Sequence, residues 1–211
     1  VNSPKLHEKS IVRLDTDEMV TLLDTVETGD NLTGHQKSYA GKTRLRDMAI
    51  VTTLLGTGIR VSELVGLDIS DIDFKNQMFK VHRKGGKEQN IYFGDEVCIA
   101  LLDYLEERNE IVAQAGSTDA LFLSLQKKRI TVRAVENLVK KYASTVAPLK
   151  PITPHKLRST FGTNLYNETG DIYLVADVLG HSDVNTTRKH YADQAEENRR
   201  KAARVIKLRD L

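Results

Sequence analysis

The fold is decided by residues 153–163, TPHKLRSTFGT, and residues 179–191, LGHSDVNTTRKHY. The first stretch follows a turn-rich segment and predicts a helix, on which His155 and Arg158 are three residues apart and therefore share a face. A further helix is predicted from Asp171 and ends at the glycine of the second stretch, because glycine is common just after a helix. His181 is therefore expected in the loop that follows.

Two strings nearer the N-terminus carry further candidate residues: TGIRVSEL at 57–64 and HRKGGKEQ at 82–89. Helical spacing of apolar residues predicts a helix over 44–55 that two glycines end, so that Arg60 opens a short helix after it. Around 77–93 the apolar period changes to two, with KGGKE as a turn, which predicts a hairpin with Lys84 at its tip.

The remaining segments are mostly helical. Asp15 or Thr16 is expected to cap a first helix, and apolar stripes predict core-facing helices over 95–113 and 132–146. The polar, glycine-containing residues 28–43 are interpreted as a loop. The predicted fold class is therefore α+β, mostly helical, with a small antiparallel sheet.

Composition excludes few functions. The chain has 211 residues, 40% of them apolar, and a net charge of +2, which alone does not argue for a nucleic-acid partner. An acid-rich segment at 95–119 and a basic one at 127–141 are interpreted as solvated helix faces. No apolar run approaches membrane-spanning length, so we expect a cytoplasmic protein without a membrane partner. Cys98 is the single cysteine, which excludes an internal disulfide.

In this order, the four strings resemble the tyrosine recombinase family, which includes phage integrases, Xer recombinases and the integrases of conjugative transposons. The resemblance runs from about residue 12 to the end and implies a catalytic domain over residues 12–192, preceded by a linker or tail at 1–11. Residues 193–211 would be a helical tail, exchanged between protomers. Family members usually carry another DNA-binding domain first, so we expect a fragment of a longer protein.

The residue types suit phosphoryl transfer without a metal. Arg60 and Arg158 are candidates for binding one phosphate, because the planar guanidinium donates two parallel hydrogen bonds and keeps its charge. Each could instead form an ordinary ion pair, and Glu63 is a possible partner for Arg60. The resemblance makes Glu63 a supporting residue, so both interpretations can hold.

A tyrosine nucleophile needs a base or a cationic pocket, because its unperturbed pKa is about 10. His155 is predicted to accept or share that proton, and His181 to donate to a phosphate oxygen. By similarity to the hairpin lysine of the family, Lys84 protonates the 5′-oxygen leaving group, with Lys87 as the fallback.

Tyr191 is the predicted nucleophile among seven tyrosines. A polar stretch precedes it and no apolar stripe includes it, whereas the other six are explained as packing or loop residues. Many family members place the nucleophile nine residues after the histidine of the LGH string, where this chain has His190. Others place it ten after, which fits Tyr191.

We expect no cofactor and no metal, since the sequence has neither a Walker motif nor zinc-ligand spacing. The predicted function is a site-specific DNA recombinase or integrase that forms a 3′-phosphotyrosyl intermediate. One alternative is a type IB topoisomerase-like enzyme that relaxes DNA, and another is a DNA-binding module without activity. The expected partner is double-stranded DNA, bound by a homotetramer that is monomeric when free, with accessory DNA-bending proteins possible.

Overall fold

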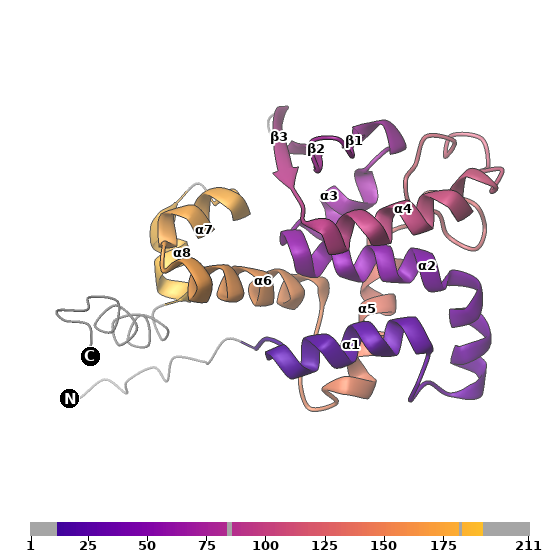
Figure 1. Cartoon of the computed structure of the whole chain (residues 1–211), viewed down its shortest axis with the longest axis horizontal. Coiled ribbons are helices and arrows are strands. Elements are labelled where there is room, and N and C mark those ends of the chain that lie inside the picture. The colour runs from indigo at the N-terminus through magenta and orange to yellow at the C-terminus, as the bar shows by residue number, and fades with distance from the viewer. Residues whose placement is uncertain (1–11, 84–85, 182, 192–211) are drawn as a thin grey trace, which may run out of the picture.

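A computed structural model describes residues 12–83, 86–181 and 183–191 (Figure 1). The helices are α1 (Thr16–Thr28), α2 (Gly34–Thr57), α3 (Val61–Gly66), α4 (Asp95–Asn109), α5 (Val132–Val146), α6 (Pro154–Thr169), α7 (Ile172–Leu179) and α8 (Val184–His190). A short 3-10 helix, η1 (Ile69–Asp71), precedes the strands β1 (Ile72–Asp73), β2 (Met78–Arg83) and β3 (Lys87–Tyr92). The strands form one antiparallel sheet in the order β1-β2-β3. The predicted fold class is confirmed.

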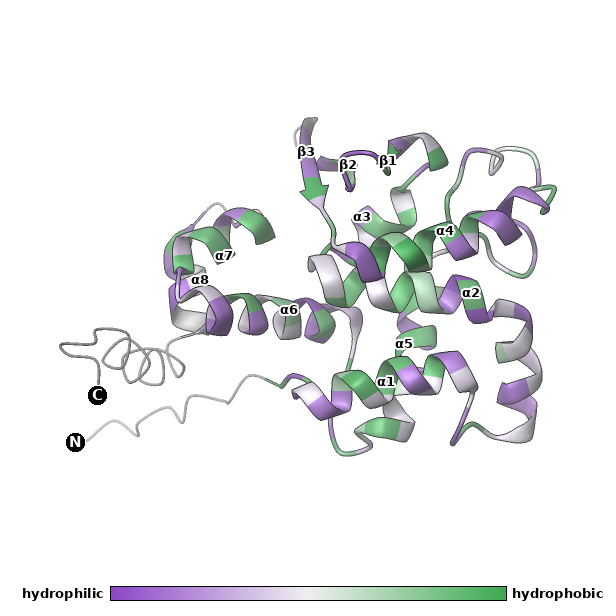
Figure 2. Ribbon diagram, viewed as in Figure 1, coloured by the Kyte–Doolittle hydropathy of each residue, from purple (hydrophilic) through white to green (hydrophobic). Residues whose placement is uncertain are grey.

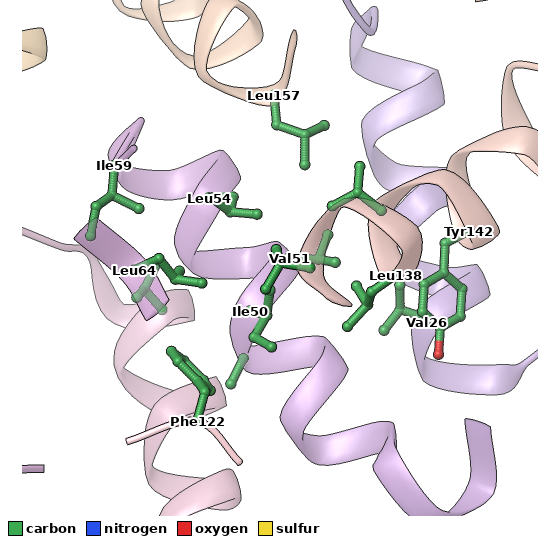
Figure 3. Close-up of a cluster of buried hydrophobic side chains, with 14 of the residues drawn as sticks. Val26, Ile50, Val51, Leu54, Ile59, Leu64, Phe122, Leu138, Tyr142 and Leu157 are labelled. Carbon is green, nitrogen blue, oxygen red and sulfur yellow. The ribbon is translucent and has the colours of Figure 1, made fainter. Parts of the chain in front are cut away.

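The second half of α2 is the centre of the larger core. Ile50, Val51 and Leu54 have no exposed surface, and α1, α4, α5 and α6 all contact this helix (Figures 1 and 3). Burying each such aliphatic side chain contributes about 1.5–3 kcal/mol to stability. None of the helices in the described ranges is long and apolar enough to cross a membrane.

The prediction of a loop over residues 28–43 is right only for residues 29–33, because α2 begins at Gly34. Thr33 caps this helix by accepting from the backbone N–H of Gln36, whose side chain in turn accepts from the backbone N–H of Thr33. This reciprocal pair stabilises a helix start in a polar sequence. Only Ala40 and Thr43 are buried between Gly34 and Thr43, so the first turns of α2 lack the apolar stripe on which the prediction depended.

The helix predicted over 95–113 is also shorter, since α4 ends at Asn109. The buried guanidinium of Arg108 donates to the carbonyl oxygens of Ala120 and Thr118, at distances of 2.8–3.1 Å. Arg108 therefore fixes the irregular segment that follows the helix.

Helix α6 belongs to two cores. Near its start, Leu157 is buried in the larger core, and Thr160 Oγ1 accepts from the backbone N–H of Leu14 at 3.1 Å. Further along, Phe161 packs on a smaller cluster built from α7 and the end of α8. Figure 1 shows α7 and α8 at one end of α6, away from α1 and α5, and Figure 2 shows hydrophobic residues along α7.

A buried carboxylate connects α2 to α5. Asp47 is fully buried, and its Oδ2 accepts from Thr43 Oγ1 at 3.0 Å, Tyr142 Oη at 2.9 Å and Lys141 Nζ at 3.3 Å. Arg46 donates to the other oxygen at 2.7 and 3.0 Å. Burial and then the charge of Asp47 raise the pKa of Tyr142, so this hydroxyl remains a donor.

We expect Tyr142→Phe to lower the free energy of unfolding by about 1–3 kcal/mol, because a hydrogen bond to a buried charge is lost. Urea unfolding measures the change. Tyr39→Phe is the matched control, since the Tyr39 side chain lies on α2 with 49% of its surface exposed. Equal midpoints for the two variants would contradict the role given to the Asp47 cluster.

Candidate active site

Arg158 is a buried cation held by the ends of two helices. Its Nη1 donates to the carbonyl oxygen of Gly58, at the end of α2, and its Nη2 to that of Leu179, the last residue of α7. The final carbonyl groups of a helix have no partner within it and carry partial negative charge. They therefore stabilise a guanidinium that is only 7% exposed.

Left-handed glycines make both of these helix ends. Gly58 and Gly180 each have φ of 62°, a conformation that a side chain disfavours. A Cβ at Gly180 would lie 1.4 Å from Arg83 Nη1, so a side chain at this position would displace the Arg83 guanidinium.

Arg60 and Glu63 form a second unit of the site. Arg60 is the residue before α3, and Glu63 accepts from its backbone N–H at 3.1 Å and from its Nη1 at 2.9 Å. Arg60 Nη2 reaches the carbonyl oxygen of Gly180 at 3.4 Å. The Glu63 side chain is 6% exposed and that of Arg60 is 39% exposed. The buried carboxylate therefore orients a guanidinium that is partly exposed to solvent.

The two arginines lie close enough to affect each other. Burial, followed by the charge of Arg60, lowers the pKa of Arg158 to about 10, so Arg158 stays cationic at neutral pH. An anion placed between the two guanidinium groups would reduce their mutual repulsion.

His181 follows Gly180 in the loop after α7, as predicted, with its Nδ1 2.6 Å from the buried Thr187 Oγ1 of α8. A cleft of about 970 Å³ opens in front of it. The cleft is lined by Arg60, Ser62, Glu63, His82, Arg83, Glu88, Gln89, Asp177, Gly180 and His181. His155 lies exposed in the first turn of α6, one turn before Arg158.

The structure thus brings Arg60, Glu63, Arg158 and His181 together around Gly180. Lys84 lies outside the described residues, as do the predicted linker at 1–11 and tail at 193–211. Across the described ranges, no group of three or more His, Cys, Asp and Glu side chains is arranged to hold a metal ion.

Tyr191 is buried at the end of α8, with 2% of its surface exposed. It packs with Val175 and Leu179 in the smaller cluster, although no apolar stripe of the sequence includes it. A Cβ on Gly162 of α6 would lie 2.1 Å from the Tyr191 hydroxyl oxygen. The tyrosine therefore occupies the space that this glycine leaves. The residues that surround Tyr191 are distant from it in the sequence, so no local sequence pattern indicated its burial.

Burial raises the pKa of Tyr191 to about 12, although the charges of Arg158 and Arg13 oppose the shift. The phenol is therefore protonated at neutral pH.

Sequence reasoning missed Arg83, the last residue of β2. Its Nε donates to Glu63 Oε1 at 3.1 Å, the same oxygen that accepts from Arg60. The only signal in the sequence was a basic residue directly before Lys84.

Comparison with known proteins shows the family to which the chain belongs. The model of the phage integrase family matches residues 12–198. The chain belongs to the phage integrase family. A relative from Pelobacter propionicus, tyrosine recombinase XerC, is 35% identical over 190 residues, which are 90% of this chain and 58% of that protein. The chain thus spans less than two thirds of the length of that relative.

Two solved structures are similar to this member of the phage integrase family. The XerA recombinase has a TM-score of 0.76 at 29% identity, over 92% of this chain and 66% of that one. The Tn1549 transposon integrase in complex with circular intermediate DNA has a TM-score of 0.70 at 25% identity, over 93% and 68% of the two chains.

We expect Gly162→Ala to destabilise the protein by about 1–3 kcal/mol, because the new methyl group collides with the Tyr191 hydroxyl. The cost should be smaller in a Tyr191→Phe background, where the closest atom is gone. A double-mutant cycle by urea unfolding measures this coupling. Identical costs in both backgrounds would contradict the packing of Tyr191 on Gly162.

The raised pKa of Tyr191 predicts a pH dependence of stability. Folding keeps this phenol protonated, so its contribution is complete below about pH 10 and is lost as pH rises through about 12. Relative to Tyr191→Phe, the wild type should lose about 1 kcal/mol by about pH 11. Urea unfolding of both proteins between about pH 8 and 11 measures the difference. Parallel pH profiles would contradict the burial of a protonated Tyr191.

Proposed function

We propose that this chain is the catalytic domain of a site-specific DNA recombinase that cleaves and rejoins strands through a 3′-phosphotyrosyl link. The observation that carries the proposal is the buried Arg158 beside the more open Arg60, with Tyr191 near enough for its pKa to respond to Arg158. Support comes from membership of the phage integrase family and from relatives named as tyrosine recombinases.

In this mechanism, the Tyr191 hydroxyl oxygen attacks the scissile phosphorus, and the bond from phosphorus to the 5′-oxygen breaks. Arg60 and Arg158 donate to the non-bridging oxygens, which gain negative charge in the transition state. Arginine has five N–H donors, and the two carbonyl bonds of Arg158 leave others for phosphate. Glu63 orients Arg60.

Two proton transfers complete the first step. We assign His155 to accept or share the tyrosine proton, and Lys84 to protonate the 5′-oxygen, with Lys87 as the fallback. His181 donates to a phosphate oxygen, and its contact with Thr187 holds the ring. The 5′-hydroxyl of a partner strand then displaces the tyrosine, so no cofactor supplies energy.

DNA binding must change the surroundings of Tyr191. A phenol with a pKa of about 12 reacts slowly at neutral pH. The Tyr191 side chain is also buried, with its hydroxyl oxygen packed on Gly162, which leaves no room for a phosphate. We therefore propose that α8 shifts when DNA binds and presents the hydroxyl between the arginines.

Double-stranded DNA is the proposed partner, and the Tn1549 integrase structure, solved with DNA, supports it. We further propose that the protein forms a homotetramer on paired DNA sites and that residues 193–211 are exchanged between protomers. The proposed catalytic domain covers residues 12–192. The family match extends to residue 198, so this boundary stays a prediction. The same proposal includes a monomeric state without DNA, accessory DNA-bending proteins, a mobile-element origin and a cytoplasmic location.

We expect Tyr191→Phe to abolish covalent trapping on a nicked DNA substrate with the cognate site, because it removes the attacking oxygen. A denaturing gel measures the slow-migrating adduct, and a mobility shift confirms that DNA still binds. Tyr166→Phe is the matched control, since this neighbouring ring lies 6.1 Å from that of Tyr191 and should keep the adduct.

An adduct that persists in Tyr191→Phe would contradict the assignment of the nucleophile. Relaxation of plasmids that lack any specific site, without strand exchange, would favour a topoisomerase-like enzyme. DNA binding without an adduct in the natural-length wild-type protein would favour a binding module.

A further inference from the structure

Arg83 is a third guanidinium at the arginine pair, contributed by the sheet. Its side chain is 13% exposed, although it is the last residue of a hairpin strand. Its Nε shares Glu63 Oε1 with Arg60, and its guanidinium lies against the backbone of Gly180. A single carboxylate oxygen therefore holds two guanidinium groups at once.

The remaining donors of Arg83 are not fully used. Its Nη2 is buried and, among the described residues, has no hydrogen-bond partner. Buried donors are almost always paired, because an unpaired one loses its bonds to water without replacement. Arg83 also lines the cleft, and a buried unpaired donor on a residue of the cleft wall indicates a partner that enters from outside.

The charges of the cleft indicate an anionic partner. Arg83 also lowers the pKa of Arg158, after burial and Arg60, so the three guanidiniums repel one another. Glu63 is the carboxylate placed between them. Of the other acids lining the cleft, Glu88 pairs with Lys80 at 3.2 Å, and Asp177 lies exposed on α7.

We propose that Arg83 is a third phosphate-binding arginine, which donates through Nη2 to a non-bridging oxygen of the scissile phosphate. This inference rests on the proposed function and deepens it. Arg83 would act where the Tyr191 oxygen bonds to phosphorus and the 5′-oxygen leaves, stabilising the charge that develops on the phosphate. Because Arg83 is the last residue of β2, the hairpin would contact the phosphate directly through this side chain.

The alternative is a structural ion pair between Arg83 and Glu63, and a neutral substrate separates the two. A methylphosphonate replaces one charged non-bridging oxygen with a methyl group. An arginine that acts on phosphate charge has less to stabilise on this substrate, whereas a structural arginine is needed equally on both. The rate of adduct formation is therefore compared on phosphodiester and methylphosphonate DNA, with the protein at its natural length.

On phosphodiester DNA we expect Arg83→Met to slow adduct formation by about 10²-fold, as for loss of one donor to a transition state. On methylphosphonate DNA the loss should shrink to about twofold, within ordinary non-additivity. Arg83→Lys keeps the charge without the fork and should lose less on the phosphodiester, with the same dependence on phosphate charge. It gives a second reading if Arg83→Met fails to fold, as judged by circular dichroism.

Arg129→Met is the matched control. Arg129 is a structural arginine that pairs with Asp68 and donates to the carbonyl oxygens of Val65 and Leu67 at 3.1 and 3.0 Å. Any loss it causes should be equal on both substrates.

Equal losses for Arg83→Met and Arg83→Lys on the two substrates, or no loss on either, would overturn the proposal for Arg83. A wild-type protein that forms no adduct on phosphodiester DNA contradicts the proposed function itself. The two failures are therefore distinguishable.

Discussion

The burial of one guanidinium constrains the whole site. Arg158 replaces water by bonding to the carbonyl groups at the ends of α2 and α7, and both helices must therefore stop where they do. Gly58 and Gly180 make those ends possible because they adopt left-handed backbone angles. The positions of Arg60, just after one end, and His181, just after the other, follow from the same arrangement. The buried Arg158 guanidinium thus holds together α6 and the ends of α2 and α7, which are far apart in the sequence.

Much of this site could be predicted from the sequence because its residues come in local strings. Arg158 follows His155 by one helical turn, and glycine marks the end of the helix before His181. The pairing of Arg60 with Glu63 was expected from their spacing on one face. Arg83 and Gly162 could not be found in this way. Their importance depends on which side chain from another element faces them, and local spacing carries no record of that contact.

The fold shows the same division. Apolar periodicity predicted the buried helices and the hairpin, because burial imposes that pattern. It failed for the start of α2, which is exposed and begins at a hydrogen-bonded cap on Thr33. It also overran the end of α4, where Arg108 recruits the carbonyl groups of the next segment. Polar interactions set these boundaries, and hydrophobic spacing does not report them.

Helix α6 connects two cores of unequal size. The larger core includes residues from α1 to α6, whereas the smaller is built on Val175, Leu179 and Tyr191. Units with little buried apolar surface open at lower free energy than the rest of a protein. We expect amide hydrogens of α7 and α8 to exchange by local opening, while those of α2 exchange only on global unfolding. Among the described residues, Tyr191 would then belong to the less stable of the two cores, and Arg158 would lie at the boundary with the more stable one.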